Sequence, residues 1–287
     1  SRGQQLEKRT CPGRLTGSAR TFVGSLPTSS PPTPPFTMHR RPSERTFLFG
    51  IHPVLEALEE AKPLQRILFL KGKQTDEISD ILRQCRALDI PAQAVPKERL
   101  DRVTRKNHQG VIAFTSPIEF QPLDEVVLGA FERGETPLIV ALDGVTDVRN
   151  LGAIARTAEV FGATGLLVPM TGSAPINEDA VKSSAGALLR LPMCRAKRMD
   201  EALQMTVNLG LSPVAISEKG SQPLSSLDGA VPTCLVLGDE HAGISADVLK
   251  HCNSSVSIPM KGKTGSLNVG VAAGIVLYAF HQKLFTP

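Results

Sequence analysis

Hydrophobic residues along this chain follow two different periods. From Asp76 to Asp89, apolar side chains recur at every third or fourth position, which is typical of an amphipathic helix. The runs at 66–70 and 138–142 are short and almost continuously apolar, which is typical of buried strands. Segments of the two kinds alternate from Thr46 onward, and this order predicts an α/β protein.

The first structured region is predicted to span residues 46–116. Its pattern indicates further helices at 50–60 and from Lys97, and strands at 66–70, 92–95 and 111–115. We expect a small α/β domain whose sheet is mainly parallel. Residues 117–137 contain three prolines and one short amphipathic helix at 123–131. Because this apolar content is too sparse for a core element, the segment is predicted to be a linker.

The second structured region is predicted to run from 138 to 287. Strands are expected at 138–142, 165–168, 188–194, 213–216, 234–237 and 256–258. Several of them are apolar along their whole length, as in a parallel sheet covered by helices on both faces. In such a sheet, ligands bind at the carboxyl ends of the strands.

Composition narrows the class of protein. Hydrophobic residues make up 41% and charged residues 21%, as in ordinary soluble globular proteins. The longest apolar run, Val269 to Phe280, is too short to cross a bilayer, which needs about 20 residues. The five cysteines form no CxxC pair, so reduced thiols in a cytoplasmic compartment are expected and no metal site is implied.

The positive net charge is concentrated at the N-terminal end. Residues 1–45 hold eight Lys or Arg and two Glu, a balance of +6, whereas the whole chain carries +4. This Pro- and Ser-rich stretch lacks apolar periodicity and is expected to be disordered. Three interpretations stay open: an organellar transit peptide, a misassigned start ahead of Met38, or a basic arm that contacts RNA.

A cluster of basic residues lies within Arg99 to Gly110. Arg102, Arg105, Lys106 and His108 stand close together with only Asp101 opposing them. Neutralisation of nucleic-acid phosphates requires such a cluster, so these four residues are predicted to bind RNA. The alternative is a solvated helix face that runs into a polar turn.

The segment from Ser255 to Phe280 combines a short strand, a loop with Lys261 and Lys263, and an apolar helix. Asn268 is suited to cap that helix, whose first amides would then face the loop and favour an anion. A nucleotide P-loop would require glycine at position 257, which is serine.

Two other segments complete a pattern with this one: 142–162, LDGVTDVRNLGAIARTAEVFG, and 235–245, LVLGDEHAGIS. In order and spacing, the three segments resemble the motifs of the SpoU (TrmH-like) RNA ribose 2′-O-methyltransferases. The similarity extends from about 47 to 285 and is strongest to the bacterial 23S rRNA guanosine methyltransferases of this family.

The resemblance implies a knotted catalytic domain and an N-terminal substrate-binding domain similar to ribosomal protein L30e. It implies S-adenosylmethionine as cofactor, a homodimer, and methylation of a guanosine ribose in 23S rRNA, free or in a ribosome assembly intermediate. Methylation of tRNA is the alternative within the family. A non-catalytic RNA-binding protein on the same fold is a rival of another class. A Rossmann oxidoreductase is disfavoured because no GxGxxG motif follows a strand.

The resemblance also assigns roles to single residues. The residues matched to catalytic positions are Asn150, Arg156, Glu240, Ser266 and Asn268, and those matched to cofactor positions are Gly238, Ile258 and Leu267. Asn150 is expected to cap the helix that carries Arg156. Since a guanidinium does not give up its proton, Arg156 is expected to bind phosphate and stabilise the developing alkoxide, at the partner protomer's site. Asp239 and His241 depart from the family pattern around Glu240.

Overall fold

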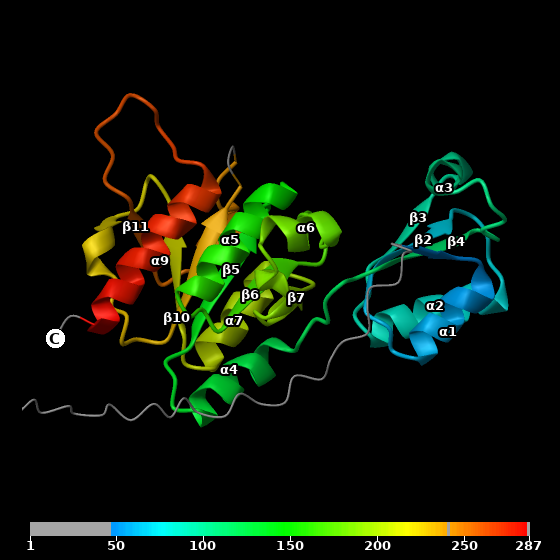
Figure 1. The fold of residues 1–287 in the computed structure, drawn as a ribbon, viewed down its shortest axis with the longest axis horizontal. Coiled ribbons are helices and arrows are strands. Elements are labelled where there is room, and N and C mark those ends of the chain that lie inside the picture. Colours follow the sequence, from blue (N-terminus) through cyan, green and yellow to red (C-terminus); the bar gives the residue numbers. More distant parts are fainter. Residues whose placement is uncertain (1–46, 240–241, 286–287) are drawn as a thin grey trace, which may run out of the picture. The chain divides into compact units, whose positions relative to one another are not determined.

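The computed structural model describes residues 47–239 and 242–285 (Figure 1). The predictions made for residues 1–45, for Glu240 and for His241 lie outside the described residues. Two regions are described separately below, the N-terminal region up to Ser116 and the C-terminal region from Pro117. No helix in the described part is long and apolar enough to cross a membrane.

The N-terminal region contains a four-stranded sheet of order β1-β4-β2-β3. Its elements are β1 (Phe47–Phe49), α1 (Ile51–Glu59), β2 (Leu64–Leu70), α2 (Asp76–Ala87), β3 (Ala92–Val95), α3 (Lys97–Val103) and β4 (Val111–Thr115). Only β2 and β3 pair in parallel, whereas β4 is antiparallel to both β1 and β2. The prediction of a mainly parallel sheet is therefore wrong, because β4 runs antiparallel to β2 although α3 precedes it, and β1 was not foreseen.

The C-terminal region contains a seven-stranded sheet of order β7-β6-β5-β10-β8-β11-β9, and every neighbouring pair is parallel. Its strands are β5 (Leu138–Asp143), β6 (Gly165–Pro169), β7 (Met193–Ala196), β8 (Ser212–Ile216), β9 (Gln222–Pro223), β10 (Thr233–Gly238) and β11 (Ser254–Ser257). Its helices are α4 (Leu123–Glu132), α5 (Val148–Val160), α6 (Glu178–Ser183), α7 (Met199–Asn208), α8 (Ala246–Leu249) and α9 (Val269–Phe285), with 3₁₀ turns η1 (Ala187–Leu189) and η2 (Leu224–Ser226). The predicted α/β fold with a parallel sheet is confirmed.

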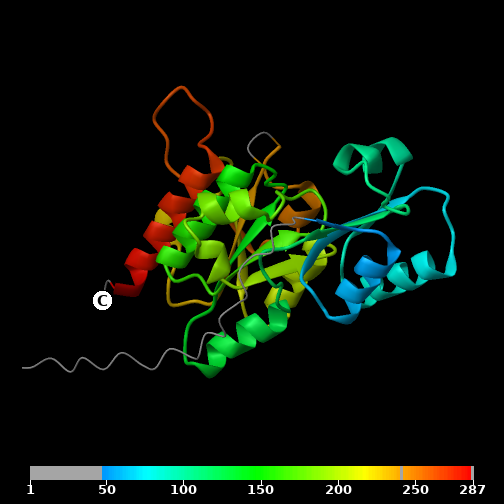
Figure 2. The same cartoon turned by 45° about the vertical axis from the view of Figure 1, so that its right-hand side comes forward.

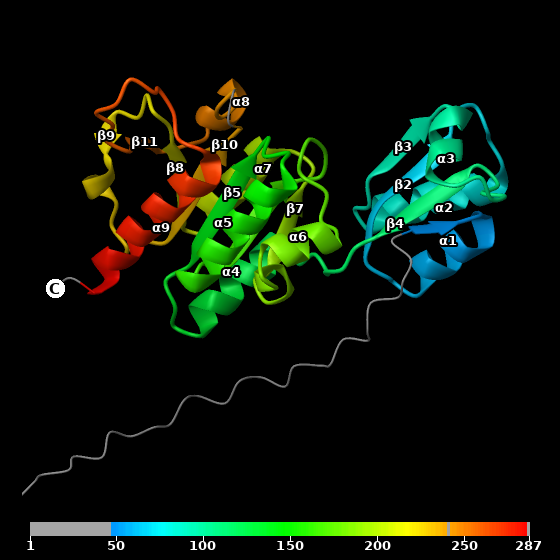
Figure 3. The same cartoon turned by 45° about the horizontal axis from the view of Figure 1, so that its top comes forward.

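Both faces of this sheet are covered, as the continuous apolar strands predicted. Along β5, Leu138, Val140 and Leu142 join a core with α5, α6 and α9, whereas Ile139 and Ala141 join a second core with α4 and α7. The alternation follows from the two-residue period of a strand. Figures 1 and 2 show α5 and α9 side by side on one face, and Figure 3 shows the same pair from above.

Two segments differ from their predictions. The stretch predicted as a strand at 188–194 begins with the 3₁₀ turn η1, and β7 starts only at Met193. The predicted linker contains α4, which buries Leu123, Val126, Val127 and Ala130 against the sheet. Phe120, just before α4, forms a bridge with Met193 at the edge strand β7. Four apolar residues are enough to pack α4 into the core, because these four lie on one face of the helix.

Candidate active site

Helix α5 begins at the carboxyl end of β5. Its N-cap is Asp147, whose carboxylate accepts a hydrogen bond from the backbone N–H of Arg149 at 2.7 Å. The same carboxylate forms an ion pair with the guanidinium of Arg149 at 3.1 Å. These contacts with Arg149 lower the pKa of the Asp147 carboxyl. The prediction that Asn150 caps this helix is wrong, because the helix starts at Val148 and Asn150 lies in its first turn.

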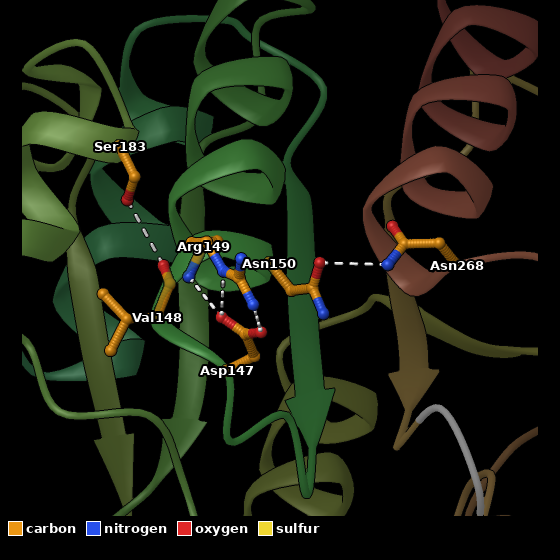
Figure 4. Close-up of polar contacts among 6 residues, drawn as sticks. All are labelled: Asp147, Val148, Arg149, Asn150, Ser183 and Asn268. Carbon is orange, nitrogen blue, oxygen red and sulfur yellow. Dashed lines mark hydrogen bonds and ion pairs between the residues drawn. The ribbon is translucent and has the colours of Figure 1, made fainter.

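Asn268 caps α9, as predicted. Its Oδ1 accepts hydrogen bonds from the backbone N–H groups of Gly270 at 2.9 Å and Val271 at 3.2 Å. The other end of the same amide, Nδ2, donates to Oδ1 of Asn150 at 3.1 Å. Figure 4 shows Asn268 and Asn150 turned toward each other from the starts of α9 and α5. Two residues matched to catalytic positions, 118 positions apart in sequence, are thus joined directly.

Small residues allow α5 and α9 to approach each other. A Cβ at Gly270 would lie 3.4 Å from the Cβ of Ala153 and 3.2 Å from Oδ1 of Asn268. A Cβ at Gly274 would meet the methyl group of Thr157 at 3.9 Å. The glycines of α9 therefore set the separation of the helices, and with it the hydrogen bond between the two asparagines.

Helix α6 supports α5 from another direction. Ser183 donates through Oγ to the backbone carbonyl of Val148 at 3.3 Å (Figure 4). A Cβ at Gly152 would lie only 2.0 Å from this Oγ, so no larger residue fits there without movement. Asn177 caps α6 through its side chain, which accepts from Ala180 at 3.0 Å. The segment 177–186 thus holds the start of α5 in place.

A pocket opens at the carboxyl ends of β8 and β10, beside the start of α9. It is lined by the following residues: Ile216, Ser217, Glu218, Leu237, Gly238, Asp239, Gly243, Ile244, Ile258, Met260, Ser266, Leu267, Val269 and Ala272. The lining includes Ser266 and all three residues predicted to contact the cofactor, Gly238, Ile258 and Leu267. Sequence reasoning missed Glu218, the second residue after β8.

Gly238 has a second reason to be a glycine. A Cβ there would lie 2.2 Å from the carbonyl carbon of Gly243 and 2.3 Å from the nitrogen of Ile244. Asp239 and Gly243 exchange two backbone hydrogen bonds of 3.0 Å. Gly243 and Ile244 therefore pack directly on Gly238, and both also line the pocket. Close approach of the chain to itself, as well as to a ligand, excludes a side chain at this position.

The lining of the pocket fits a ligand that carries both a positive charge and an aromatic ring system. The apolar residues Leu237, Ile258 and Leu267 line it together with the acidic residues Glu218 and Asp239, and Oδ1 of Asp239 accepts from the backbone N–H of Ala242 at 2.8 Å. Among the described residues that form its walls there is no lysine or arginine. A sulfonium cofactor matches this charge, whereas a nucleoside triphosphate would require cations.

Arg156 lies outside this pocket. It is an exposed residue of α5, six positions after Asn150, which places it about 240° further around the helix. Ala153 and Val160 share its exposed side. Arg156 is therefore not one of the residues that line the pocket of its own chain. Glu240 follows the pocket residue Asp239 but lies outside the described residues.

The predicted RNA-binding residues divide into two groups. Arg102, Arg105 and Lys106 are exposed, whereas His108 is only 8% exposed. The backbone N–H of Gly110 donates to Nδ1 of His108 at 3.0 Å, so Nε2 carries the proton and donates to Oδ1 of Asp101 at 3.0 Å. This placement argues against direct RNA contact by His108. Its ring instead helps to position the loop of residues 104–110, here called the basic loop, which carries Arg105 and Lys106.

The neighbours of His108 also serve the fold. Oε1 of Gln109 accepts from the backbone N–H of Ile51 at 2.9 Å, so its side chain caps α1. The carbonyl of Gln109 accepts from Nζ of Lys73 at 2.8 Å. Gln109 and Gly110 both have positive φ angles, 52° and 85°, which form the turn before β4. The side chains of His108 and Gln109 are thus both engaged within the protein.

The described part of the chain contains neither a side-chain cluster suited to a metal ion nor a reactive thiol. No group of His, Cys, Asp and Glu there could hold a metal ion. Cys85, Cys194, Cys234 and Cys252 are free thiols. Burial raises the pKa of Cys85 to about 11 and that of Cys194 to about 12, so both thiols stay protonated and unreactive near neutral pH.

Comparison with known proteins was consistent with this geometry. The model of the SpoU rRNA methylase family matches residues 137–278, and that of RNA 2′-O-ribose methyltransferase substrate binding matches residues 47–121. A protein of Mycolicibacterium vanbaalenii named "uncharacterized tRNA/rRNA methyltransferase" is 35% identical over 241 residues, which cover 83% of this chain and 77% of the relative. A protein of the same name from Mycobacterium avium is 37% identical over 245 residues, with coverage of 83% and 79%.

Solved structures have a similar fold. The SpoU methyltransferase AviRb from Streptomyces viridochromogenes, in complex with AdoMet, has 27% identity and a TM-score of 0.54, covering 84% of this chain and 91% of that one. An AdoMet-bound rRNA methyltransferase from Sinorhizobium meliloti, at 24% identity, shares the fold with a TM-score of 0.54 over 84% and 88% of the two chains.

Proposed function

This chain belongs to the SpoU family of RNA 2′-O-ribose methyltransferases, and from that premise we propose that it methylates a guanosine of large-subunit rRNA. The cofactor of the family is S-adenosylmethionine, which supplies an electrophilic methyl group on a positively charged sulfur. The chain is an enzyme, and the proposal concerns its substrate. The observation that carries it is the N-terminal region, which matches the family's substrate-binding model and presents the exposed cations Arg102, Arg105 and Lys106.

Two parts of the C-terminal region would contribute to the reaction: the pocket would bind the cofactor, and helix α5 would provide Arg156. Gly238, Ile258 and Leu267 would hold the cofactor, and the carboxylates of Glu218 and Asp239 offset its charge. Asn268 is fixed in place by α9 and Asn150, so it presents its amide without further ordering. The guanidinium of Arg156 would bind the phosphate beside the target ribose and stabilise the developing alkoxide. The proton passes to that phosphate or to another group near the ribose.

The same proposal includes a homodimer that forms through α5 and α9. The outer side of α9 exposes Val271, Ile275 and Tyr278, of which Val271 is 52% and Tyr278 53% exposed. Val160 of α5 is 65% exposed, on the side that carries Arg156. Pairing of these apolar surfaces between two chains would bury them and bring Arg156 close to the partner's pocket. Such an interface also explains why Arg156 lies away from the pocket of its own chain.

The substrate is tested by mapping ribose methylation in total RNA from cells with and without the gene. We expect one guanosine in large-subunit rRNA to lose its methyl group when the gene is absent. In vitro, deproteinised large-subunit rRNA should accept a labelled methyl group where tRNA does not. Loss of a tRNA methylation instead would assign the enzyme to tRNA, and the family membership would stand.

The dimer is tested by subunit mixing. Arg156→Ala and Asn268→Ala proteins should each be inactive, and an exchanged mixture should regain about a quarter of the wild-type activity. This recovery is expected because half of the dimers are mixed, and each of these has one site with both defects and one intact site. No recovery after verified subunit exchange would place Arg156 at its own chain's site. Cytoplasmic location and the knot remain predictions, to be checked by imaging of a tagged full-length protein and by an experimental structure.

A further inference from the structure

The two faces of the N-terminal sheet are covered unequally. Helices α1 and α2 cover one face, where Ile67, Val111 and Ala113 are fully buried. The other face is covered by α3 alone, a seven-residue helix whose Leu100 is buried against Leu68. Since α3 packs on β2, the half of this face formed by β1 and β4 keeps partly exposed aromatic rings.

These rings stand in register across the sheet. Phe47 of β1 is paired with Phe114 of β4, which is paired in turn with Arg66 of β2. The ring centroids of Phe47 and Phe114 lie 6.2 Å apart, and Phe49 lies 6.2 Å from Phe47. The guanidinium of Arg66 lies over the ring of Phe114 at 4.7 Å. Phe49, Phe47 and Phe114 thus form an aromatic row, and the exposed side chain of Arg66 lies at the Phe114 end of it.

Further cations surround this row. Nζ of Lys106, from the basic loop, lies 5.9 Å from the ring centroid of Phe49. Burial and the nearby positive charge of Arg99 lower the pKa of Arg66. Within residues 47–239 and 242–285, no ion pair engages Arg66, Arg99 or Lys106, and Asp101 of α3 is hydrogen-bonded to His108. The charge at this face calls for an anionic partner.

We propose that this face, formed by Phe47, Phe49, Phe114, Arg66 and Lys106, is a platform on which an unpaired base of the RNA substrate stacks. Exposed rings stack on bases of any sequence, and neighbouring cations bind the phosphates on either side. Bases inside a duplex have no free face, so the platform selects a single-stranded loop, bulge or end. The inference rests on the RNA methyltransferase activity of the chain and is independent of which RNA is methylated.

The protein contains no tryptophan, so a single introduced indole reports on its own surroundings. In the full-length Phe47→Trp protein, a 12-nucleotide single-stranded RNA should quench the fluorescence, whereas the same sequence in a duplex should quench it far less. Phe114→Trp gives a second position in the row. The matched control is Phe131→Trp, in α4, where the native ring is 40% exposed and no cation–π contact is found. Its fluorescence should not respond to RNA.

Binding measured by filter retention completes the test. Phe47→Leu and Phe114→Leu keep an apolar side chain but remove the ring, and each should weaken single-stranded RNA binding by about five- to 150-fold, the effect of one lost base stack. Arg66→Gln should weaken it as well and reduce its salt dependence. Affinity for S-adenosylmethionine and the melting temperature of these variants should stay close to wild type.

The platform would be overturned by unquenched indoles at positions 47 and 114 while RNA is bound, or by undiminished RNA binding in the leucine variants. Equal quenching by duplex RNA would also overturn it. These outcomes can be told apart from failure of the proposed substrate, because the oligonucleotide is arbitrary and the methylated position is mapped separately. A tRNA target would leave the fluorescence result unchanged.

Discussion

The hydrogen bond between Asn150 and Asn268 joins the first and last motifs of the catalytic region, and its energy can be measured. Asn268→Ala removes the cap of α9 and the donor to Asn150 together. Loss of an N-cap costs about 1 kcal/mol, and a net hydrogen bond contributes about 0.5–1.5 kcal/mol. We therefore expect a loss of about 2 kcal/mol in the free energy of unfolding. For a region of this size that lowers the melting temperature by about 4–8 °C.

Two further variants separate the cap from the link between helices. Asn268→Ser keeps an oxygen that can accept from Gly270 and Val271, but its side chain is too short to reach Asn150. It should lose about 1 kcal/mol, as should Asn150→Ala, which leaves the cap in place. The double variant Asn150→Ala/Asn268→Ala should be less destabilised than the sum of the single variants, with a coupling of about 1 kcal/mol.

The assay is urea unfolding followed by circular dichroism, with S-adenosylmethionine affinity measured on the same proteins by calorimetry. If the double variant loses the full sum of the single losses, the bond between the asparagines carries no net energy, and the reasoning fails. If Asn268→Ser is as unstable as Asn268→Ala, the cap assignment fails instead.

Three other predictions follow from the geometry of the C-terminal region and from its buried thiols. Gly152→Ala should destabilise the protein by about 1–3 kcal/mol in urea unfolding, because its Cβ would collide with Ser183, whereas Gly265→Ala, which meets nothing within 4 Å, should not. Glu218→Gln should raise the dissociation constant for S-adenosylmethionine about tenfold in calorimetry, because it removes a negative charge from the pocket; an unchanged constant would leave Glu218 a mere surface residue. Since burial raises the pKa of Cys85 from 9.0 to about 11, its contribution to stability is present below pH 9 and is lost as the pH rises toward 11. The melting temperature should fall less over this range in Cys85→Ala than in wild type, and equal falls would contradict the shift.

The sequence predicted those features that depend on local pattern. The apolar period of 76–89 located α2, and Asn268 was correctly identified as a cap because an apolar helix of small residues follows it. Between Asp147 and Asn150 the sequence offered two residues that can cap a helix, and only the observed start of α5 decides between them. The three-residue strand β1 is too short to show a period, so the direction of the sheet was misjudged.

The direction of side chains could not be predicted. His108 belongs to a polar, basic stretch, but its ring points inward because Asp101 and the turn at Gly110 satisfy both of its nitrogens. The six-residue spacing of Asn150 and Arg156 gives their separation around α5, but the sequence does not show which side of this helix packs against α9. Glu218 was missed because its importance comes from the pocket formed by β8, β10 and the start of α9, three segments that meet only in the folded chain.

The edges of the seven-stranded sheet limit how two copies of this protein can associate. At one edge, β9 has only two residues, and one of them, Pro223, has no N–H to donate. At the other edge, Phe120 and Gln121 lie along β7, where Gln121 donates to the carbonyl of Met193 at 2.8 Å and the ring of Phe120 is covered by Arg195 at 3.7 Å. Strand addition between molecules, the usual hazard of an open sheet, therefore finds little free backbone at either end. Two copies are therefore left to associate through the helices that cover the sheet, and the side chains on these helices determine whether the two surfaces are complementary.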